Sequence, residues 1–263
     1  MTTVLVCGAG GRMGREVVNA VWQDSELQLV GAVDVSNAGM PVAEIVNNDD
    51  CQVVIMDDLQ AALEATSPDV VVDFTSPKVV FENAKTTLRY GANIVIGTTG
   101  LTADERDALA KIASEKRVGV LVAPNFSLGA VLLMQASELM AKYLPNAEII
   151  ELHHNQKYDA PSGTARLTAE KIAKARTLAP ALDKTQESLA GARGGVVEDV
   201  HIHSVRLPGY VAHQEVLFGG TGEIVTLRHD SLDRKSFMPG VLLACKKISQ
   251  FPGLTYGLEH YLG

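Results

Sequence analysis

The densest group of chemically active side chains lies between residues 151 and 165, where the sequence reads ELHHNQKYDAPSGTA. Three of these side chains can carry positive charge: His153, His154 and Lys157. Imidazole titrates near neutral pH, so a histidine here is a candidate proton donor, and a lysine ammonium is a partner for a carboxylate. The segment therefore predicts chemistry on an anion, in which His153 and Lys157 neutralise a carboxylate or deliver a proton.

The same segment contains the start of a predicted helix. Ser162 is a favourable N-cap residue, and Gly163 and Thr164 follow it in the first helical turn. Backbone N–H groups in that turn have no intrahelical partner, and the helix dipole is positive there. Ser162, Gly163 and Thr164 are therefore predicted to bind a carboxylate of the substrate.

Other interpretations of these residues stay open. Paired histidines at a strand end are often exposed and without a role, and a Ser-Gly-Thr sequence is often only a helix cap. A metal site is a third interpretation, because His153, His154, His201 and His203 could supply imidazole ligands. It is the least favoured, because adjacent strand residues point to opposite faces and no spacing for a third ligand is recognisable.

A glycine-rich turn directly follows a predicted strand at residues 4–7. It consists of Gly8, Ala9, Gly10, Gly11, Arg12, Met13 and Gly14. The spacing of the glycines at positions 8, 11 and 14 lets a strand turn tightly into a helix and lets backbone N–H groups approach a pyrophosphate. A turn without a ligand is the alternative. The dinucleotide interpretation is favoured because strand, glycines, helix and a terminal acid occur in the required order.

That acid is Asp34, which ends the second predicted strand twenty positions after Gly14. Its carboxylate can accept hydrogen bonds from both hydroxyls of an adenosine ribose, and its charge repels a 2′-phosphate. The next residue, Val35, offers no compensating charge. The sequence therefore predicts a preference for NADH, while Arg12 and Arg15 leave NADPH open as an alternative cofactor.

Two further loops follow predicted strands at the edge where open α/β sheets bind ligands. They contain Gly97, Thr98, Thr99, Ala123, Pro124, Asn125 and Phe126. Each loop taken singly has the composition of an ordinary turn. Together with the glycine-rich turn, they are predicted to surround a nicotinamide.

A parallel sheet is needed to hold these loops. Short β-branched or apolar runs predict strands at residues 4–7, 28–34, 53–56, 69–75, 93–97 and 118–123. Several runs, such as residues 70–72, are apolar throughout, as burial on both faces of a parallel sheet requires. Because helix-like segments separate most of the strands, the predicted fold class is α/β, with a Rossmann-like doubly wound parallel sheet.

The pattern changes near residue 124. Helices are predicted at residues 127–143 and 162–176, and strands at residues 146–154, 197–207, 213–218 and 223–230. These strands alternate and follow one another, mostly antiparallel, which predicts a second, α+β domain with an open mixed sheet. Residues 177–196 show no clear period and are predicted to form a long functional loop.

Composition limits the classes of function. The chain has 263 residues, 46% of them hydrophobic and 21% charged, which is typical of one large or two modest globular domains. A net charge of −8 disfavours nucleic acid and anionic membranes as partners. Three cysteines without a paired motif favour a reducing cytoplasm. No apolar run is long enough to span a bilayer, and no export signal is recognisable.

The segments GAGGRMG, GTTG, PNFS and, above all, ELHHxxKxDAPSGTA resemble the dihydrodipicolinate reductase family of lysine biosynthesis, also called 4-hydroxy-tetrahydrodipicolinate reductases. The resemblance spans the chain, since RLPG, HQEV, FGG and LRHDS at residues 206–231 are also similar. It implies an NAD(P)H-dependent oxidoreductase that reduces a cyclic imine dicarboxylate to tetrahydrodipicolinate with loss of water.

The resemblance also implies residue roles. Gly8 to Met13, Asp34, residues 97–99 and residues 123–126 would bind the cofactor. His153 and Lys157 would be catalytic, and His154, Gly163 and Thr164 would bind the substrate. The implied domains are residues 1–124 with 234–263 for the dinucleotide, and residues 125–233 for the substrate and for assembly of a homotetramer through their sheet.

Two other functions stay open. A different NAD(P)-dependent oxidoreductase would keep the glycine-rich turn but need another second domain. A semialdehyde dehydrogenase needs an activated cysteine. No cysteine of this chain lies in a sequence context that suggests activation. A non-catalytic NADH-binding sensor would leave the segment at residues 151–165 without a purpose.

Overall fold

The computed structural model describes all 263 residues of the chain. They form two compact units, one made of residues 1–126 and 237–263 and the other of residues 127–236. These bounds lie two or three residues away from the predicted ones. The chain therefore leaves the first unit once, after its sixth strand, and returns to it for the C-terminal segment.

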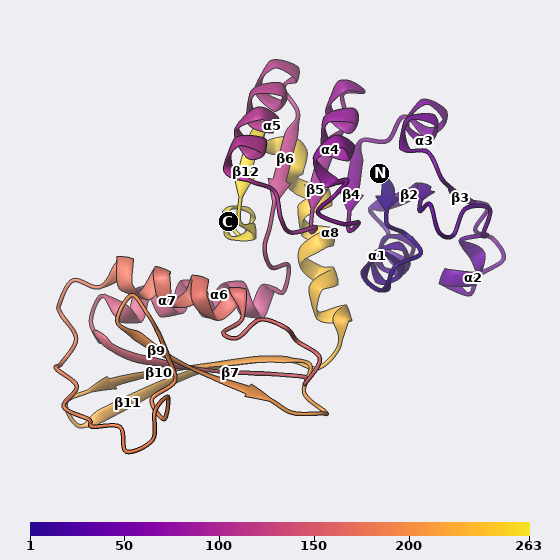
Figure 1. Cartoon of the computed structure of the whole chain (residues 1–263). Coiled ribbons are helices and arrows are strands. Elements are labelled where there is room, and N and C mark those ends of the chain that lie inside the picture. Colours follow the sequence, from indigo (N-terminus) through magenta and orange to yellow (C-terminus); the bar gives the residue numbers. More distant parts are fainter. The chain divides into compact units, whose positions relative to one another are not determined.

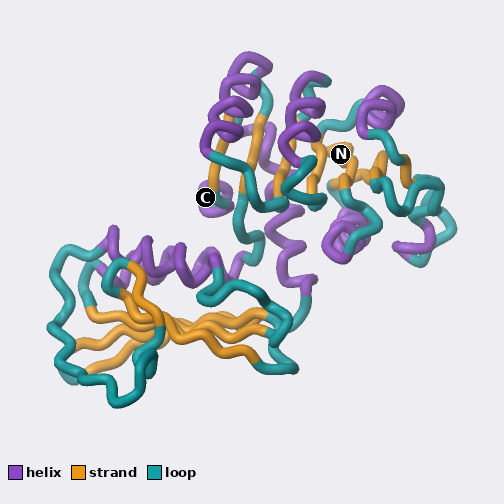
Figure 2. The backbone as a smooth tube through the Cα atoms, viewed as in Figure 1, coloured by secondary structure: helices purple, strands orange, loops and turns teal.

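The first unit contains a seven-stranded sheet (Figures 1 and 2). Its strands are β1 (Thr2–Cys7), β2 (Leu27–Val33), β3 (Ile55–Met56), β4 (Val70–Asp73), β5 (Asn93–Ile96), β6 (Gly119–Val122) and β12 (Gly253–Tyr256). They run parallel in the order β12-β6-β5-β4-β1-β2-β3. The order reverses between β1 and β4, which is the point where doubly wound sheets bind dinucleotides. The prediction of a Rossmann-like sheet is confirmed.

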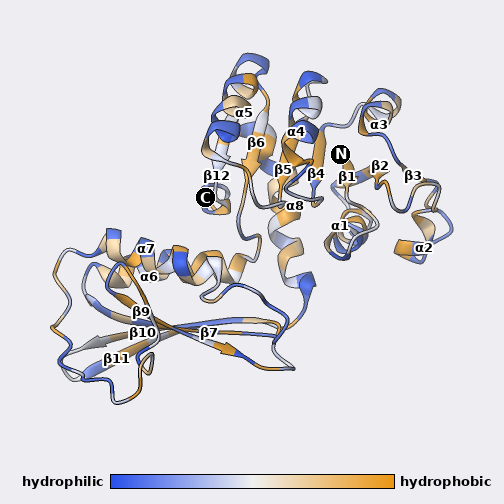
Figure 3. Ribbon diagram, in the orientation of Figure 1, coloured by the Kyte–Doolittle hydropathy of each residue, from blue (hydrophilic) through white to orange (hydrophobic).

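Helices cover both faces of this sheet. They are α1 (Arg12–Gln23), α2 (Ala43–Val46), α3 (Leu59–Thr66), α4 (Val80–Arg89), α5 (Ala103–Lys116) and α8 (Met238–Lys247). Buried residues of α3, α4 and α5 share one hydrophobic cluster with Leu5, Val71 and Ile94 of the strands. The alternate strand residues, such as Val4 and Val72, are equally buried, and α1 and α8 contact each other and β1. Burial on both faces is why the central strands of this sheet, such as β4 and β5, are largely apolar (Figure 3).

The second unit pairs a five-stranded sheet with two helices, α6 (Leu128–Ala141) and α7 (Gly163–Ala175). The strands are β7 (Asn146–His153), β8 (Gly195–Val197), β9 (Val200–Arg206), β10 (Ala212–Gly220) and β11 (Glu223–Ser231). Their order is β11-β10-β7-β9-β8. The central strand β7 is antiparallel to β10 and parallel to β9, so the prediction of a mixed sheet is confirmed.

Only one face of this second sheet is covered by helices. Ile149, Val216 and Phe218 point to that face and are fully buried with residues of α6 and α7. The intervening residues of β7 and β10, such as Ile150 and Leu217, are only partly buried. This alternation produces the mixed hydropathy of the strands in Figure 3.

Three segments differ from the predictions. The strand predicted at residues 197–207 is two strands, β8 and β9, because Glu198 and Asp199 adopt φ values of 49° and 61° and form a tight hairpin turn. The final helix, which the family resemblance implies at about residues 234–250, is divided into the 3-10 turn η1 (Arg234–Phe237), α8 and the 3-10 turn η2 (Ile248–Gln250). The edge strand β12, followed by the 3-10 turn η3 (Leu258–Tyr261), was not predicted.

No helix of either unit combines the length and the hydrophobicity that crossing a membrane requires.

Candidate active site

The glycine-rich turn lies at the carboxyl end of β1. Gly8 has a φ of +79°, which favours glycine, and an added Cβ would lie 2.5 Å from the carbonyl oxygen of Phe74. An added Cβ on Gly14 would lie 1.9 Å from the carbonyl oxygen of Gly8. The first turn of α1 therefore packs directly on the loop, as close helix–strand packing in a dinucleotide site requires.

The N-terminus of α1 is open to a ligand. Its N-cap is Gly11, which supplies no side-chain hydrogen bond, and the first turn contains no acidic residue. The N–H groups of Arg12 and Met13 therefore lie at the positive end of the helix without a capping side chain. This arrangement fits the pyrophosphate of a dinucleotide. Gly8 and Ala9 do not contribute in this way, because their N–H groups donate to the carbonyl oxygen of Val33.

Asp34 follows the end of β2 and is held by its own chain. One carboxylate oxygen accepts a hydrogen bond from the N–H of Gly10 at 3.1 Å, and the other accepts from Ser36 N–H and Asn37 Nδ2. Arg15 donates to the carbonyl oxygen of Gly10 at 2.9 Å. The carboxylate is thus fixed against the glycine-rich turn, with a guanidinium also bonded to that turn.

The loop after β5 is organised by an acid that sequence reasoning did not single out. Asp73, the last residue of β4, is fully buried and accepts hydrogen bonds from Thr98 Oγ1 at 2.7 Å, from Asn83 Nδ2 at 2.8 Å and from Thr75. Thr98 in turn accepts from the N–H of Thr75. Thr98 is therefore a buried anchor that joins the loops after β4 and β5.

Aromatic rings join the loop after β6 to these loops. Phe126 is buried, and its ring centroid lies 5.7 Å from that of Phe74. An added Cβ on Gly97 would lie 2.1 Å from the Phe74 ring, so this ring lies directly against the loop after β5. Ala123 is also buried, whereas Pro124 is exposed.

The structure thus places the predicted cofactor residues at the carboxyl ends of β1, β2, β5 and β6. Because all strands of the sheet are parallel, these ends share one edge.

The second cluster lies in the other unit, where β7 ends and α7 begins. His153 is the last residue of β7, and its Nδ1 atom is hydrogen-bonded to Oε2 of Glu151. Glu151 is fully buried and is also bonded by Arg206 of β9, through Nη1 to Oε2 at 2.9 Å and through Nη2 to Oε1 at 2.7 Å. The N–H of Ser162 donates to Oε1 at 3.3 Å. One buried carboxylate therefore connects the histidine to the start of α7.

The charge state of this carboxylate follows from its partners. Burial raises the pKa of the Glu151 carboxyl, but hydrogen bonds from His153, Arg206 and Ser204 outweigh burial and hold that pKa at about 2. Glu151 is consequently ionised at neutral pH.

The remaining predicted residues surround the same point. Ser162 caps α7 by accepting a hydrogen bond from the N–H of Ala165. Lys157 Nζ donates to Asp159 Oδ1 at 2.7 Å. Burial raises the pKa of the Asp159 carboxyl, yet hydrogen bonds from Lys157 and from the N–H of Gly163 lower it overall. The sequence led us to expect that the N–H of Gly163 has no partner within the protein. In the structure it does have one, because the carboxylate of Asp159 lies at the helix N-terminus.

The two other candidates differ in exposure. His154 is exposed, and its Nδ1 accepts a hydrogen bond from the N–H of Gln156. Thr164 is partly buried in the first turn of α7. Sequence reasoning missed Glu151, Arg206 and Asp159. The only signal for Glu151 was its position two residues before His153 on the same strand face.

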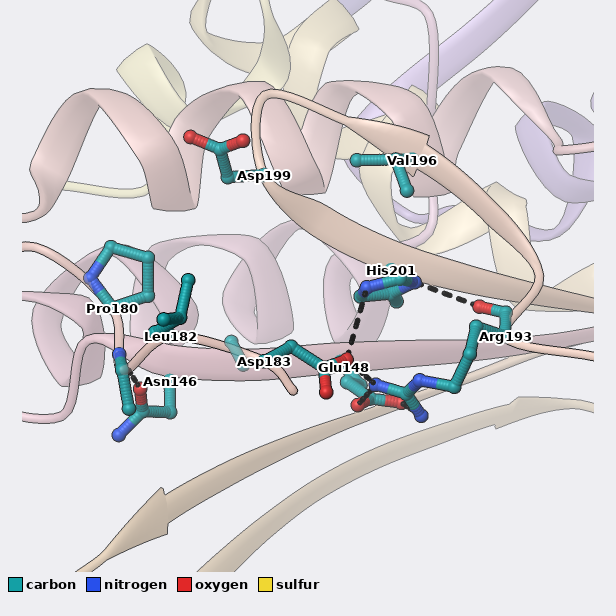
Figure 4. Close-up of a pocket in the computed structure, with 11 residues that line it drawn as sticks. Asn146, Glu148, Pro180, Leu182, Asp183, Arg193, Val196, Asp199 and His201 are labelled. Atoms are coloured by element: carbon teal, nitrogen blue, oxygen red, sulfur yellow. Dashed lines mark hydrogen bonds and ion pairs between the residues drawn. The ribbon is translucent and has the colours of Figure 1, made fainter. Parts of the chain in front are cut away.

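A pocket of about 580 Å³ lies elsewhere in the second unit, between β7 and the loop after α7 (Figure 4). Arg193 from that loop pairs with Glu148 of β7 and, at 3.3 Å, with Asp183. His203 Nε2 lies 2.8 Å from Glu148. None of the predicted catalytic, cofactor-binding or substrate-binding residues lines this pocket, although His201, named above only as a possible metal ligand, does. No group of three or more His, Cys, Asp or Glu side chains in the structure is arranged to hold a metal ion.

A doubly wound sheet with an open glycine-rich helix start, followed by a separate mixed-sheet unit, defines the chain as a two-unit oxidoreductase with a nicotinamide cofactor. Family models described as the N-terminus and the C-terminus of dihydrodipicolinate reductase match residues 2–126 and 129–262. The chain belongs to the dihydrodipicolinate reductase family, and the family assigned from the sequence is confirmed.

Individual relatives agree. The chain is 51% identical over 260 residues to the 4-hydroxy-tetrahydrodipicolinate reductase of Syntrophomonas wolfei, covering 98% of both chains. It is 48% identical over 267 residues to that of Gloeothece citriformis, covering 98% of this chain and 97% of the relative. The solved structure of a dipicolinate-bound dihydrodipicolinate reductase from Paenisporosarcina sp. TG-14 has a TM-score of 0.89 at 42% identity, with both chains fully covered. An amine dehydrogenase from Mycobacterium smegmatis, at 14% identity and a TM-score of 0.68 over 97% of this chain and 94% of the other, shares the fold alone.

Proposed function

We propose that this chain reduces 4-hydroxy-tetrahydrodipicolinate to tetrahydrodipicolinate, with loss of water, in lysine and diaminopimelate biosynthesis. The observation that carries the proposal is the group formed by His153, Lys157 and the start of α7, in a chain 51% identical to a reductase named for this substrate. The group offers one proton donor and two sites for anions, which is what a cyclic dicarboxylate needs.

The first unit binds the cofactor through the edge described above. The uncapped start of α1 fits a pyrophosphate because it leaves backbone N–H groups without a capping side chain, and the close packing at Gly14 holds the helix directly against the loop. Reduced nicotinamide, when bound, supplies the hydride for the reaction. The loops after β5 and β6, anchored through Thr98 and Phe126, orient the nicotinamide.

The second unit binds the diacid. Lys157 and the N–H groups at the start of α7 hold its carboxylates, with His154 and Ser162 at the edge of the site. In the structure, Asp159 bonds both Lys157 and the N–H of Gly163, so a substrate carboxylate takes the place of an internal one. His153 then donates a proton from its Nε2 atom, because Nδ1 is bonded to Glu151.

The decisive experiment follows the loss of reduced-nicotinamide absorbance with the cyclic imine, made in the assay from pyruvate and aspartate semialdehyde. The expected result is turnover that depends on both precursors. In parallel, pyridine-2,6-dicarboxylate should raise the melting temperature of the NADH complex. Absence of both effects would refute the proposed activity. Turnover of the imine distinguishes this activity from that of an NADH-binding sensor or of another oxidoreductase.

NADH is the preferred cofactor in this proposal. Asp34 is fixed at the glycine-rich turn, and the exposed Val35 brings no positive charge to a 2′-phosphate. Arg15, bonded to Gly10, and Arg12, the first residue of α1, are nearby cations that favour NADPH. Comparing kcat/KM for the two cofactors tests the preference, and a clear NADPH advantage would overturn it.

The functional protein is a homotetramer in the cytoplasm. Support for assembly comes from the second sheet, one face of which has no helix and includes an exposed Ile224 on β11. Support for a reducing compartment comes from the three buried, unpaired cysteines. Sedimentation equilibrium tests the assembly, and a monomer would contradict it.

A further inference from the structure

The Glu151 carboxylate is hydrogen-bonded to several other residues of the second unit. His153 Nδ1 and Arg206 Nη1 both contact its Oε2, while Arg206 Nη2 and the N–H of Ser162 contact its Oε1. The carboxylate is fully buried. Unpaired burial of a charge is strongly unfavourable, so this carboxylate is present only together with these partners.

Arg206 extends the same network to the lysine. Its Nη2 atom also donates to the carbonyl oxygen of Asp159 at 2.6 Å, and the Asp159 side chain bonds Lys157. A planar guanidinium that makes two parallel bonds to a carboxylate fixes both groups in one plane. The rigid Glu151–Arg206 pair thus contacts His153, the start of α7 and the loop that contains Lys157 and Asp159.

We propose that Glu151 and Arg206 are positioning residues for the reaction, and that they keep a proton on Nδ1 of His153 so that Nε2 is the nitrogen that donates to the substrate. The proposal rests on the proposed function, because it assigns the orientation of the proton donor used there.

The proton count follows from this arrangement. Cationic His153 carries protons on both ring nitrogens. When Nε2 gives its proton to the substrate, the N–H bond at Nε2 breaks and the neutral ring keeps its Nδ1 proton against Glu151. Solvent returns a proton to Nε2 before the next turnover. Glu151 accepts a hydrogen bond throughout and is never itself protonated, in keeping with its carboxyl pKa of about 2.

The same strand carries a comparable cluster that serves as a control. Glu148, three residues earlier on β7, points to the other face of the sheet and contacts Arg193 and His203 (Figure 4 shows Glu148 and Arg193). Its side chain is 33% exposed, whereas that of Glu151 is 0% exposed. The two clusters have the same residue types, but only the Glu151 cluster is buried beside the proposed site.

Glu151→Gln tests the proposal because one of the two orientations of the amide places fewer hydrogen-bond donors against its NH₂ group. With its oxygen toward His153, its NH₂ would face two donors, Arg206 Nη2 and the N–H of Ser162. With its NH₂ toward His153, it faces one donor, Arg206 Nη1, and can donate to an unprotonated Nδ1. The variant should therefore switch neutral His153 from the Nδ1–H to the Nε2–H tautomer.

The tautomer is measured by two-bond ¹H–¹⁵N spectra of the full chain with labelled histidine, and His153→Gln assigns the signals. In the unaltered protein we expect the Nδ1–H form for neutral His153, and in Glu151→Gln the Nε2–H form. Steady-state kinetics should show kcat lowered roughly 10²-fold or more, the worth of a correctly placed general acid, with KM changed less than threefold. In Glu148→Gln, the His203 signals should move while those of His153 and kcat stay unchanged.

Several outcomes would overturn the proposal. The Nε2–H form in the unaltered protein would do so directly, even if Glu151→Gln failed to fold. An unchanged tautomer in a folded Glu151→Gln, or a loss confined to KM, would also do so. If the unaltered protein does not turn over the cyclic imine, the proposed function fails instead, while the tautomer measurement still decides the role of Glu151.

Discussion

At the scale of single residues, the proposed proton transfer depends on His153. His153→Gln removes the ionisable ring while keeping a side chain of similar length. We expect kcat to fall by roughly 10²-fold or more, because a positioned general acid contributes that much. The matched control is His260→Gln, which changes an exposed histidine of the first unit. A decrease of only severalfold would remove His153 from the chemistry.

Lys157 has a different role, since it neutralises a carboxylate. Lys157→Ala leaves a substrate carboxylate without its charged partner, and a hydrogen bond to a charged group contributes about 1.5–3 kcal/mol. We expect KM for the imine to rise tenfold or more, with a decrease in kcat as well. Lys174→Ala, an exposed residue of α7, is the control. Unchanged kinetics in Lys157→Ala would refute the role.

At the scale of elements, the start of α1 can be tested by a single methyl group. In Gly14→Ala, the added Cβ would lie 1.9 Å from the carbonyl oxygen of Gly8, so the helix and the loop must separate. Overpacking of this kind typically costs about 1–3 kcal/mol. We expect NADH to bind roughly tenfold more weakly in a fluorescence titration. Glu16→Ala on the same helix should bind NADH normally, and equal affinity of the two variants would contradict the packing argument.

The elements also show how far a sequence can be interpreted. Strands β1, β2 and β4 to β6 were predicted close to their observed bounds, because burial on both faces leaves a continuous apolar run. The edge strand β12 has no such run, and it forms because its backbone pairs with β6. Likewise, the loop residues of the site follow strand ends and were accessible to prediction. The Glu151–Arg206 pair joins residues 55 positions apart, and no local pattern indicates such a contact.

At the scale of the whole molecule, carboxyl groups with a lowered pKa are unevenly distributed between the two units. The carboxyl groups whose pKa is lowered in the first unit are Asp24 and Glu64. Those in the second unit are Glu148, Glu151, Asp159, Asp183, Glu187 and Asp230. Because Glu151 is the fully buried member of these groups, the second unit depends more strongly on an ionised carboxylate.

The sign of the pH dependence follows. A carboxyl group whose pKa is lowered by folding stabilises the folded state above its ordinary pKa, and this contribution is lost as the pH falls through the folded value. For Glu151 the loss runs from about 4.5 down to about 2. We expect the second unit to unfold first in this range. Far-UV circular dichroism should then decrease before the fluorescence of Trp22, the single tryptophan, which lies on α1. Coincident acid transitions by both probes would contradict the prediction.

β7 has acidic residues with basic partners on both of its faces, Glu148 outward and Glu151 inward. If β7 shifted by one residue against β9 and β10, each of its side chains would move to the opposite face of the sheet. Each carboxylate would then be separated from its arginine. The ion pairs and the hydrophobic pattern of β7 therefore specify a single register for this strand. A one-residue insertion or deletion within β7 should be far more damaging than most substitutions there, and length variation belongs in the surrounding loops.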